Sequence, residues 1–149
     1  MLRLALGPTR WLTAAAVFVT IGLAPASQAE PEERYTVETQ IPEMAVASQD
    51  TFTFTVKSSG DYRIDADYDA ELVFMPEVDD EVLVAAKSHH GPKDASYGDD
   101  GRSQSWSVPV TAKRRGRHPV KLSMRFRVCD GDDCHIGRYQ TRFHVVVKD

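Results

Sequence analysis

The sequence predicts an all-β sandwich, and three observations support this fold class. From residue 35 onward, short runs of β-prone residues alternate apolar and polar side chains with a period of two. Clusters of Gly, Pro, Asp and Ser separate these runs, as turns would. No window shows the 3.6-residue period of an amphipathic helix. We therefore expect one domain over residues 30–149, with about seven strands in two packed sheets.

The alternation also places the individual strands. In the second run, Phe52, Phe54 and Val56 share one face and threonines the other. Trp106 lies on the apolar side of its strand and is expected in the core, while Pro109 indicates an edge strand or a bulge. Residues 88–104 are rich in Gly, Ser and Asp and predict a mobile surface loop. The expected strands lie within 34–41, 50–58, 58–64, 70–76, 81–87, 105–112, 120–129 and 134–147.

Residues 1–29 predict a secretory signal peptide. Arg3 and Arg10 precede an apolar run from Trp11 to Ala24, and Ser27 and Ala29 occupy the small-residue positions before a cut that follows residue 29. This run has 14 residues, whereas a helix needs roughly 20 to cross a bilayer. Cleavage is therefore favoured over an uncleaved membrane anchor. The expected product is a periplasmic or secreted monomer with no membrane segment.

The charge balance argues against nucleic acid as a partner. Residues 30–149 contain 16 Lys and Arg against 22 Asp and Glu, an acidic balance that suits no phosphate backbone. Residues 30–100 hold 5 basic and 18 acidic side chains, whereas residues 101–149 hold 11 basic and 4 acidic ones. We expect the two halves to neutralise each other across one folded domain, in preference to forming a dedicated anion site.

The last two runs predict a β-hairpin that carries both cysteines of the chain. If Cys129 and Cys134 are directly opposed, two apolar faces that were assigned separately come into register. Opposed residues have α-carbons about 4.5 to 5.5 Å apart, a distance that a disulfide can span. The two faces consist of Leu122, Met124, Phe126 and Val128 on one strand, and of Tyr139, Thr141, Phe143, Val145 and Val147 on the other.

The residues leave three uses of this pair open, namely a structural disulfide, a redox-active pair and a metal site. A disulfide that closes so small a ring stabilises the fold little, while its place at a hairpin tip favours exchange with a partner thiol. The neighbouring aspartates would raise the pKa of a free thiol, whereas Arg127 and a protonated His135 would lower it. A metal site of Cys129, Cys134 and His135 is the third use. It is disfavoured, because consecutive strand residues point to opposite faces and tetrahedral sites need four convergent ligands.

The remaining polar clusters predict no further chemistry. His89 and His90 fall in the expected loop and should be solvated, and the aspartate-rich turns lack the spacing of a calcium loop. No G-x-S-x-G sequence occurs, so hydrolase chemistry has no support. We expect no cofactor and no metal.

The predicted register also gathers like charges on the outer face of the hairpin. It sets Arg125 beside Arg138 and Lys121 beside Arg142, a basic stripe that needs acidic neighbours. We expect these from the acidic half of the chain, including residues 98–101, in preference to an acidic partner protein.

Two segments resemble a known family. "GRHPVKLSMRFRVCDGDDCHI" (116–136) and "GDYRIDADYDAELVF" (60–74) are similar to the immunoglobulin-like domain at the N-terminus of the thiol:disulfide interchange protein DsbD, and to related stand-alone exported domains. The resemblance covers most of residues 33–148. It implies an immunoglobulin-like sandwich in which Cys129 and Cys134 shuttle between dithiol and disulfide.

The resemblance further implies a thioredoxin-like or other exported protein partner. The sequence departs from the family where His135, Ile136 and Gly137 replace the usual prolines, and the 149 residues include neither an electron-delivering membrane domain nor a thioredoxin-like domain. The alternative is a non-catalytic periplasmic binding or accessory module in which the disulfide is structural.

Overall fold

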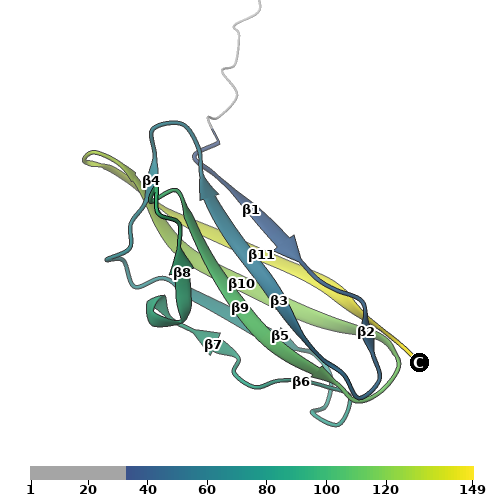
Figure 1. Ribbon diagram of the computed structural model, residues 1–149. Helices are drawn as coiled ribbons and strands as arrows, with labels where there is room; N and C mark the ends of the chain where they lie inside the picture. Colours follow the sequence, from purple (N-terminus) through teal and green to yellow (C-terminus); the bar gives the residue numbers. More distant parts are fainter. Residues whose placement is uncertain (1–32) are drawn as a thin grey trace, which may run out of the picture. The chain divides into compact units, whose positions relative to one another are not determined.

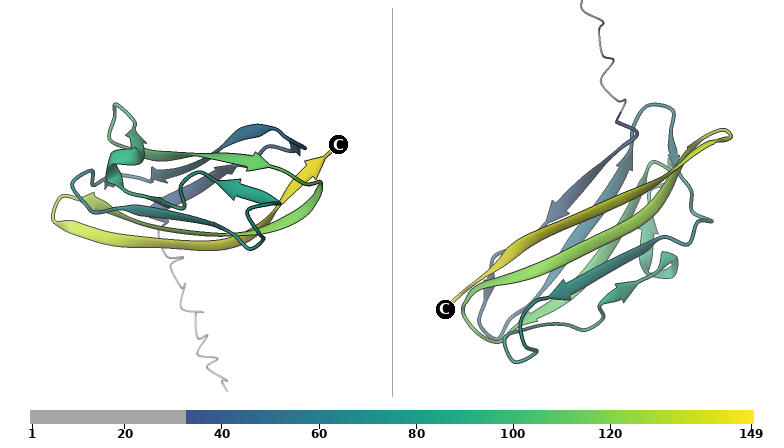
Figure 2. Two further views of the ribbon diagram at one scale, coloured as in Figure 1. Left: turned by 90° about the horizontal axis from the view of Figure 1, so that it is seen from below. Right: turned by 180° about the vertical axis from the view of Figure 1, so that it is seen from behind.

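The computed structural model describes residues 33–149, and the expected signal peptide lies outside this part of the chain. Residues 33–149 form an immunoglobulin-like β-sandwich of two sheets, which confirms the predicted fold class (Figures 1 and 2). Within these residues, no helix is long and apolar enough to cross a membrane. The elements are β1 (Tyr35–Gln40), β2 (Met44–Ala45), β3 (Gln49–Ser58), β4 (Arg63–Ile64), β5 (Glu71–Pro76), β6 (Leu83–Ala85), β7 (His89–His90), the 3-10 turn η1 (Pro92–Asp94), β8 (Ala95–Tyr97), β9 (Ser103–Ala112), β10 (Gly116–Asp130) and β11 (Asp133–Lys148).

The strands divide between two sheets, which the left view of Figure 2 shows as two layers. One sheet has the order β1-β3-β9-β6, with β8 also paired to β9. The other has the order β2-β11-β10-β5-β7, with β4 also paired to β10. Neighbouring strands are antiparallel, apart from the short parallel pairing of β2 with the end of β11. The described strand segments outnumber the expected seven because five of them have only two or three residues.

The core lies between the layers and follows the alternation in the sequence. Phe52, Phe54 and Trp106 are fully buried, as predicted. The Phe74 ring comes from the other sheet, and its centroid lies 5.7 Å from that of Phe52 and 6.0 Å from that of Phe54. Burial of each such side chain contributes about 1.5–3 kcal/mol, so the two alternating faces hold the layers together.

Strands β10 and β11 form the predicted hairpin in the predicted register. Cys129 pairs with Cys134, and Met124 pairs with Tyr139. Gly131 has a φ of +56° in the two-residue turn, a conformation that glycine adopts without steric cost. The tip of the hairpin extends past the ends of the neighbouring strands (Figure 1), so the disulfide lies beyond the main core.

Pro109 occupies a strand that is central to its sheet. Strand β9 pairs with β3 on one side, and on the other with β8 and β6. Residues 107–109 fall between the stretches that pair with β8 and β6. Pro109 therefore lies where this side of β9 has no partner among the described strands, which is how a proline is accommodated without loss of a ladder hydrogen bond.

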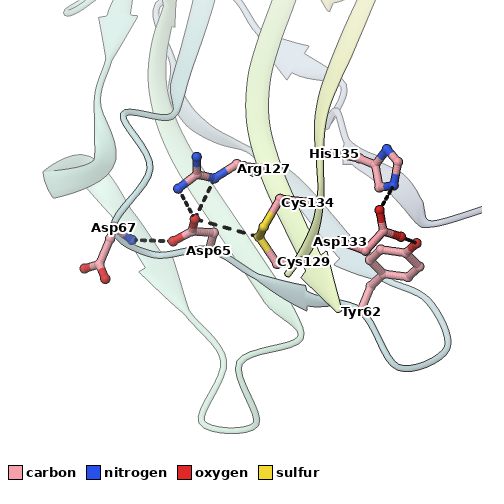
Figure 3. Close-up of a disulfide and its surroundings, with 8 residues drawn as sticks. All are labelled: Tyr62, Asp65, Asp67, Arg127, Cys129, Asp133, Cys134 and His135. Carbon is pink, nitrogen blue, oxygen red and sulfur yellow. Dashed lines mark hydrogen bonds and ion pairs between the residues drawn. A yellow bond between two sulfur atoms is a disulfide. The ribbon is translucent and has the colours of Figure 1, made fainter. Parts of the chain in front are cut away.

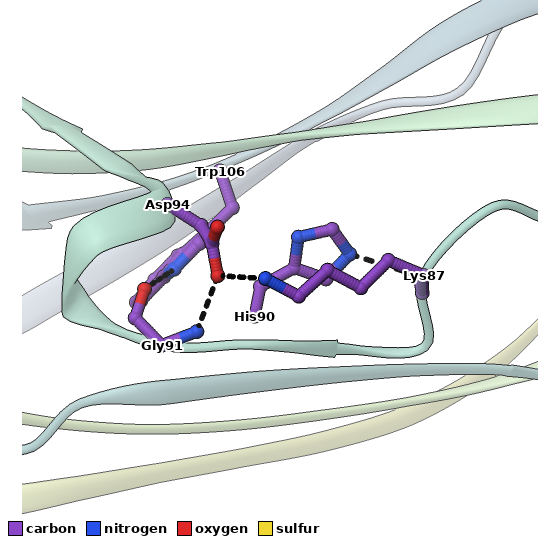
Figure 4. A network of polar contacts seen from close by, with 5 residues as sticks. All are labelled: Lys87, His90, Gly91, Asp94 and Trp106. Atoms are coloured by element: carbon purple, nitrogen blue, oxygen red, sulfur yellow. Dashed lines mark hydrogen bonds and ion pairs between the residues drawn. The ribbon is translucent and has the colours of Figure 1, made fainter.

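The prediction of a mobile loop at residues 88–104 is wrong. This segment contains β7, η1 and β8, and it packs against the sandwich (Figure 1). The indole N–H of Trp106 donates to the carbonyl of Gly91 at 3.1 Å, and the Lys87 ammonium bonds to the Asp94 carboxylate at 2.6 Å (Figure 4). Since a buried indole N–H needs an acceptor, Trp106 fixes the segment above it.

His90 also corrects the sequence prediction. His89 is exposed as expected, but His90 is only 5% exposed, and its Nε2 lies 3.0 Å from the carbonyl oxygen of Lys87. The period-two geometry of β7 turns the second histidine inward. A buried histidine with a backbone partner is a structural side chain here.

Candidate functional site

The candidate site is the disulfide at the tip of the hairpin. Cys129 and Cys134 are bonded to each other, with α-carbons 4.1 Å apart. Cys129 is half-buried and Cys134 is exposed. The two cysteines differ in their neighbours: Cys129 pairs on its far side with Arg63 of β4, whereas no described strand flanks Cys134 on the outer side of β11. Solvent and a partner thiol therefore reach the sulfur of Cys134 more easily.

An ion pair lies beside the sulfur of Cys129 (Figure 3). The Arg127 side chain donates through Nε to Oδ2 of Asp65 at 2.6 Å, and that oxygen is 3.9 Å from Sγ of Cys129. The Asp67 backbone N–H donates to the other carboxylate oxygen at 3.0 Å, and the Arg127 guanidinium lies 5.0 Å from the ring centroid of Tyr68. The charges of Arg127 and Asp65 oppose each other, so their net effect on a thiolate at Cys129 is smaller than that of either alone.

A second polar chain lies on the other side of the disulfide, where Figure 3 shows Asp133 between Tyr62 and His135. The Tyr62 hydroxyl donates to Asp133 at 2.6 Å, and Nε2 of His135 lies 2.9 Å from the second oxygen of Asp133. The hydrogen bond from Tyr62 lowers the pKa of Asp133 and raises the pKa of Tyr62. Nε of Arg34 also donates to the Tyr62 hydroxyl at 3.3 Å. These contacts connect the turn before β4 to the hairpin tip.

Sequence reasoning found the cysteines, Arg127 and His135, but it missed Asp65 and Tyr62. Both residues lie more than 60 positions before Cys129, and they reach the hairpin because β4 pairs with residues 128 and 129 of β10. Strand β4 has two residues, too few to show an alternation that predicts its partner. The described residues contain no group of three or more His, Cys, Asp or Glu side chains arranged for a metal.

The basic stripe on the outer face of the hairpin is partly neutralised from β5 and the residue that follows it. Glu77 forms ion pairs with Lys121 and Arg142, and Glu71 lies 3.5 Å from Arg125. Both acids belong to the acidic half of the chain, as expected. No ion pair of the described residues joins the stripe to residues 98–101, so the prediction that this loop covers it is wrong. The loop instead contacts β4, where the N–H of Ile64 donates to the carbonyl of Gly101.

A shallow hollow of about 430 Å³ opens on the same outer face. Val73 and Met75 of β5 form its apolar part, and Met75 is 49% exposed. Lys121, Gln140 and Arg142 supply polar lining. The hollow lies along the sheet and is distinct from the disulfide at its end.

No family model and no curated protein sequence matches this chain. Several solved structures are similar in fold. Domains 4 and 5 of the S-layer protein SbsC share 13% identity over 77% of this chain and 51% of that chain, with a TM-score of 0.41, so the match spans about half of that structure. AggA, the major subunit of the aggregative adherence fimbriae type I from Escherichia coli, shares 10% identity over 76% of this chain and 94% of that chain, with a TM-score of 0.42. A PapD-like domain of human CEP192 shares 11% identity over 89% and 99%, with a TM-score of 0.33.

Proposed function

We propose that residues 33–149 are an exported thiol-disulfide interchange-like domain, which exchanges the Cys129–Cys134 disulfide with a thioredoxin-like partner. The observation that carries the proposal is the open position of Cys134, an exposed residue at the start of β11 on the projecting tip. Disulfides that a partner thiolate can reach are the ones suited to exchange. The sequence resemblance of residues 60–74 and 116–136 to the N-terminal domain of DsbD supports the same chemistry.

The exchange would proceed in two displacement steps. A thiolate of the partner attacks Sγ of Cys134, the bond to Cys129 breaks, and Cys129 leaves as a thiolate beside Arg127. A second thiolate of the partner then attacks the mixed disulfide and releases Cys134 as a thiolate. The partner is oxidised to a disulfide, and this domain is reduced to a dithiol. The same steps in reverse would pass electrons to the partner.

The reduction potential of the cysteine pair tests the proposal. Equilibration of the protein with glutathione buffers, followed by thiol trapping, gives the fraction reduced at each potential. We expect a value in the range of thiol oxidoreductases, roughly −120 to −270 mV. A value below about −300 mV would indicate a structural bond and overturn the proposal.

Single-cysteine variants test the order of attack. We expect the free thiol of Cys134 in Cys129→Ser to react with an aromatic disulfide reagent at least about tenfold faster than the free thiol of Cys129 in Cys134→Ser, because access limits the reaction. Both measurements should be made in the folded state, with the reagent reaction in denaturant as the reference. Equal rates in the folded state would contradict the assignment of Cys134 as the attacked sulfur.

A second candidate function is a binding or accessory module in which the disulfide only shapes the tip. The observation in its favour is the Asp65 carboxylate 3.9 Å from Sγ of Cys129, since a negative charge there disfavours release of a thiolate. This function predicts that the variant with both cysteines changed to Ala keeps its partner binding. The exchange function predicts that the same variant loses all thiol transfer while it remains folded.

A further inference from the structure

We propose that the outer edge of β11 is a docking site for an extended peptide segment of a partner protein, which adds to the sheet as a further strand and presents acidic side chains to Arg138 and Arg142. This inference goes beyond the proposed function, because it involves no cysteine chemistry. It rests on the pairing of β11, on the direction of its backbone groups and on its charge.

The outer edge of β11 is open along most of its length. On one side, β11 pairs with β10 from residue 133 to residue 147. On its other side, the only pairing with a described strand is that of Val147 and Lys148 with β2. An edge strand with a long row of unpaired backbone groups is a template for the addition of another strand.

Two backbone hydrogen bonds show which residues face this edge. The carbonyl of Arg127 accepts from the N–H of Asp65 on the β4 side of β10, so the opposed residue Ile136 is not bonded across the hairpin. The carbonyl of Lys148 accepts from the N–H of Val46 at the outer side of β11. Both observations direct the even-numbered residues of β11 outward, since antiparallel ladders alternate. The outward residues are Cys134, Ile136, Arg138, Gln140, Arg142 and His144.

Charge at this edge selects the occupant. Residues 134–148 contain no Asp or Glu. Arg138 forms no ion pair with a described residue, and Arg142 shares the single carboxylate of Glu77 with Lys121. A strand laid beside β11 places its outer-face side chains directly opposite these arginines, where acidic residues attract and basic ones repel. Two copies of β11 would bring four guanidinium groups together, and the one carboxylate that pairs with them in each copy, that of Glu77, is already shared with Lys121, so self-pairing is disfavoured.

The inner side of the same edge favours alternate apolar residues in the added strand. Tyr139 and Phe143 point toward the core but are only half-buried, and Phe143 packs 6.3 Å from both Phe54 and Phe74, centroid to centroid. Tyr35 and Val37 of β1, the edge strand of the other sheet, are half-buried as well. Apolar side chains of an added strand would cover these surfaces. The predicted ligand therefore alternates apolar and polar residues, with acids four positions apart.

The test uses a synthetic acetylated peptide amide, TVEVTVEV, whose two glutamates match the spacing of Arg138 and Arg142. Titration into the full-length protein is followed by calorimetry, and hydrogen exchange locates the contact. We expect saturable binding, protection of the outward amides of β11, and affinity at least about tenfold above that of TVKVTVKV at low salt. Failure of the acidic peptide to bind, equal affinity for both peptides, or protection at β1 would overturn the proposal.

Three variants separate the contributions of backbone and charge. Gln140→Pro removes one outward N–H without loss of a bond to β10. It should lower the affinity for the peptide about tenfold or more, whereas Gln140→Ala should leave the affinity unchanged. Arg138→Glu should reverse the preference in favour of TVKVTVKV. The matched control Arg117→Glu changes an exposed arginine of β10 away from the edge and should leave the preference unchanged. Binding that is indifferent to Gln140→Pro would overturn the proposal.

Hydrogen exchange of the protein without peptide tests the other possible occupants of the β11 edge. We expect the outward amides of β11 to exchange rapidly without peptide at every protein concentration. Protection that grows with protein concentration would assign the edge to a second copy, and protection independent of concentration would assign it to the chain itself. Either result would overturn the proposal, and neither bears on the thiol exchange of Cys129 and Cys134.

Discussion

The polar network around the disulfide and the network around Trp106 use the same kinds of groups but differ in burial. Trp106 is fully buried and His90 nearly so, and their partners are backbone carbonyls (Figure 4). At the tip, the Asp133 side chain is 62% exposed and that of His135 34% exposed. A buried polar group that loses its partner costs far more than an exposed one, which water can satisfy. The first network therefore fixes the fold, and the second leaves its groups available to a partner.

The largest effect is expected at Trp106. Trp106→Ala should lower the free energy of unfolding by about 3–5 kcal/mol, because it leaves a cavity and removes the donor to Gly91. Urea denaturation followed by circular dichroism measures the loss. Trp106→Phe retains most of the ring and should cost less, about 1–3 kcal/mol, since mainly the hydrogen bond is lost. A loss below about 1 kcal/mol for Trp106→Ala would show that this network does not fix the fold.

The next effect is expected where the hairpin meets the core. A Cβ at Gly137 would lie 2.2 Å from the ring of Phe126. Gly137→Ala should therefore destabilise the protein by about 1–3 kcal/mol through overpacking. Gly91→Ala is the matched control, because nothing lies within 4 Å of the added Cβ there. Equal and small losses in the two variants would contradict the close packing of the hairpin on this part of the core.

Removal of the disulfide should cost less than the loss of Trp106. The ring that joins Cys129 to Cys134 spans a sequence separation of 5, and closure of so short a loop is worth at most about 2 kcal/mol in the chain-entropy model. The variant with both cysteines changed to Ala, measured by urea denaturation, should lose no more than this. The wild-type protein in excess reductant serves as the control and should show the same loss. A loss as large as that of Trp106→Ala would make the bond a main support of the fold.

The same two regions explain what the sequence could predict. The hairpin register followed from residues alone, because each strand is long and has a clear alternation that a slip by one residue would invert. Residues 88–104 were mispredicted, because their strands have two or three residues and depend on Trp106 from another part of the chain. The place of Asp65 and Tyr62 beside the cysteines was not predicted for the same reason, since tertiary pairing through β4 brings them there. Local patterns therefore located the cysteines and their neighbours on the hairpin, but not the groups that other parts of the chain bring beside them.

The smallest effect is expected at Asp133, and it is best seen as a change of pKa. The hydrogen bond from Tyr62 lowers the pKa of Asp133 in the folded protein, with His135 and Arg34 contributing less. Because the folded-state pKa lies below the unfolded one, the interaction stabilises the tip above the ordinary pKa of an aspartate. That contribution is lost as the pH falls through the folded-state pKa. An acid titration therefore releases this contact.

Carbon-13 NMR of the Asp133 carboxyl group measures this pKa directly. In Tyr62→Phe, which retains the ring but removes the donor, the pKa of Asp133 should rise toward its ordinary range. His135→Ala should raise the pKa by a smaller amount, because Tyr62 is the largest cause of the shift. Neither variant should alter the urea midpoint at neutral pH by as much as Gly137→Ala does, since water can replace the lost partner at an exposed site. If the pKa of Asp133 stays the same in Tyr62→Phe, the turn before β4 does not hold the hairpin tip. The surroundings of Cys134 would then be set by the hairpin alone.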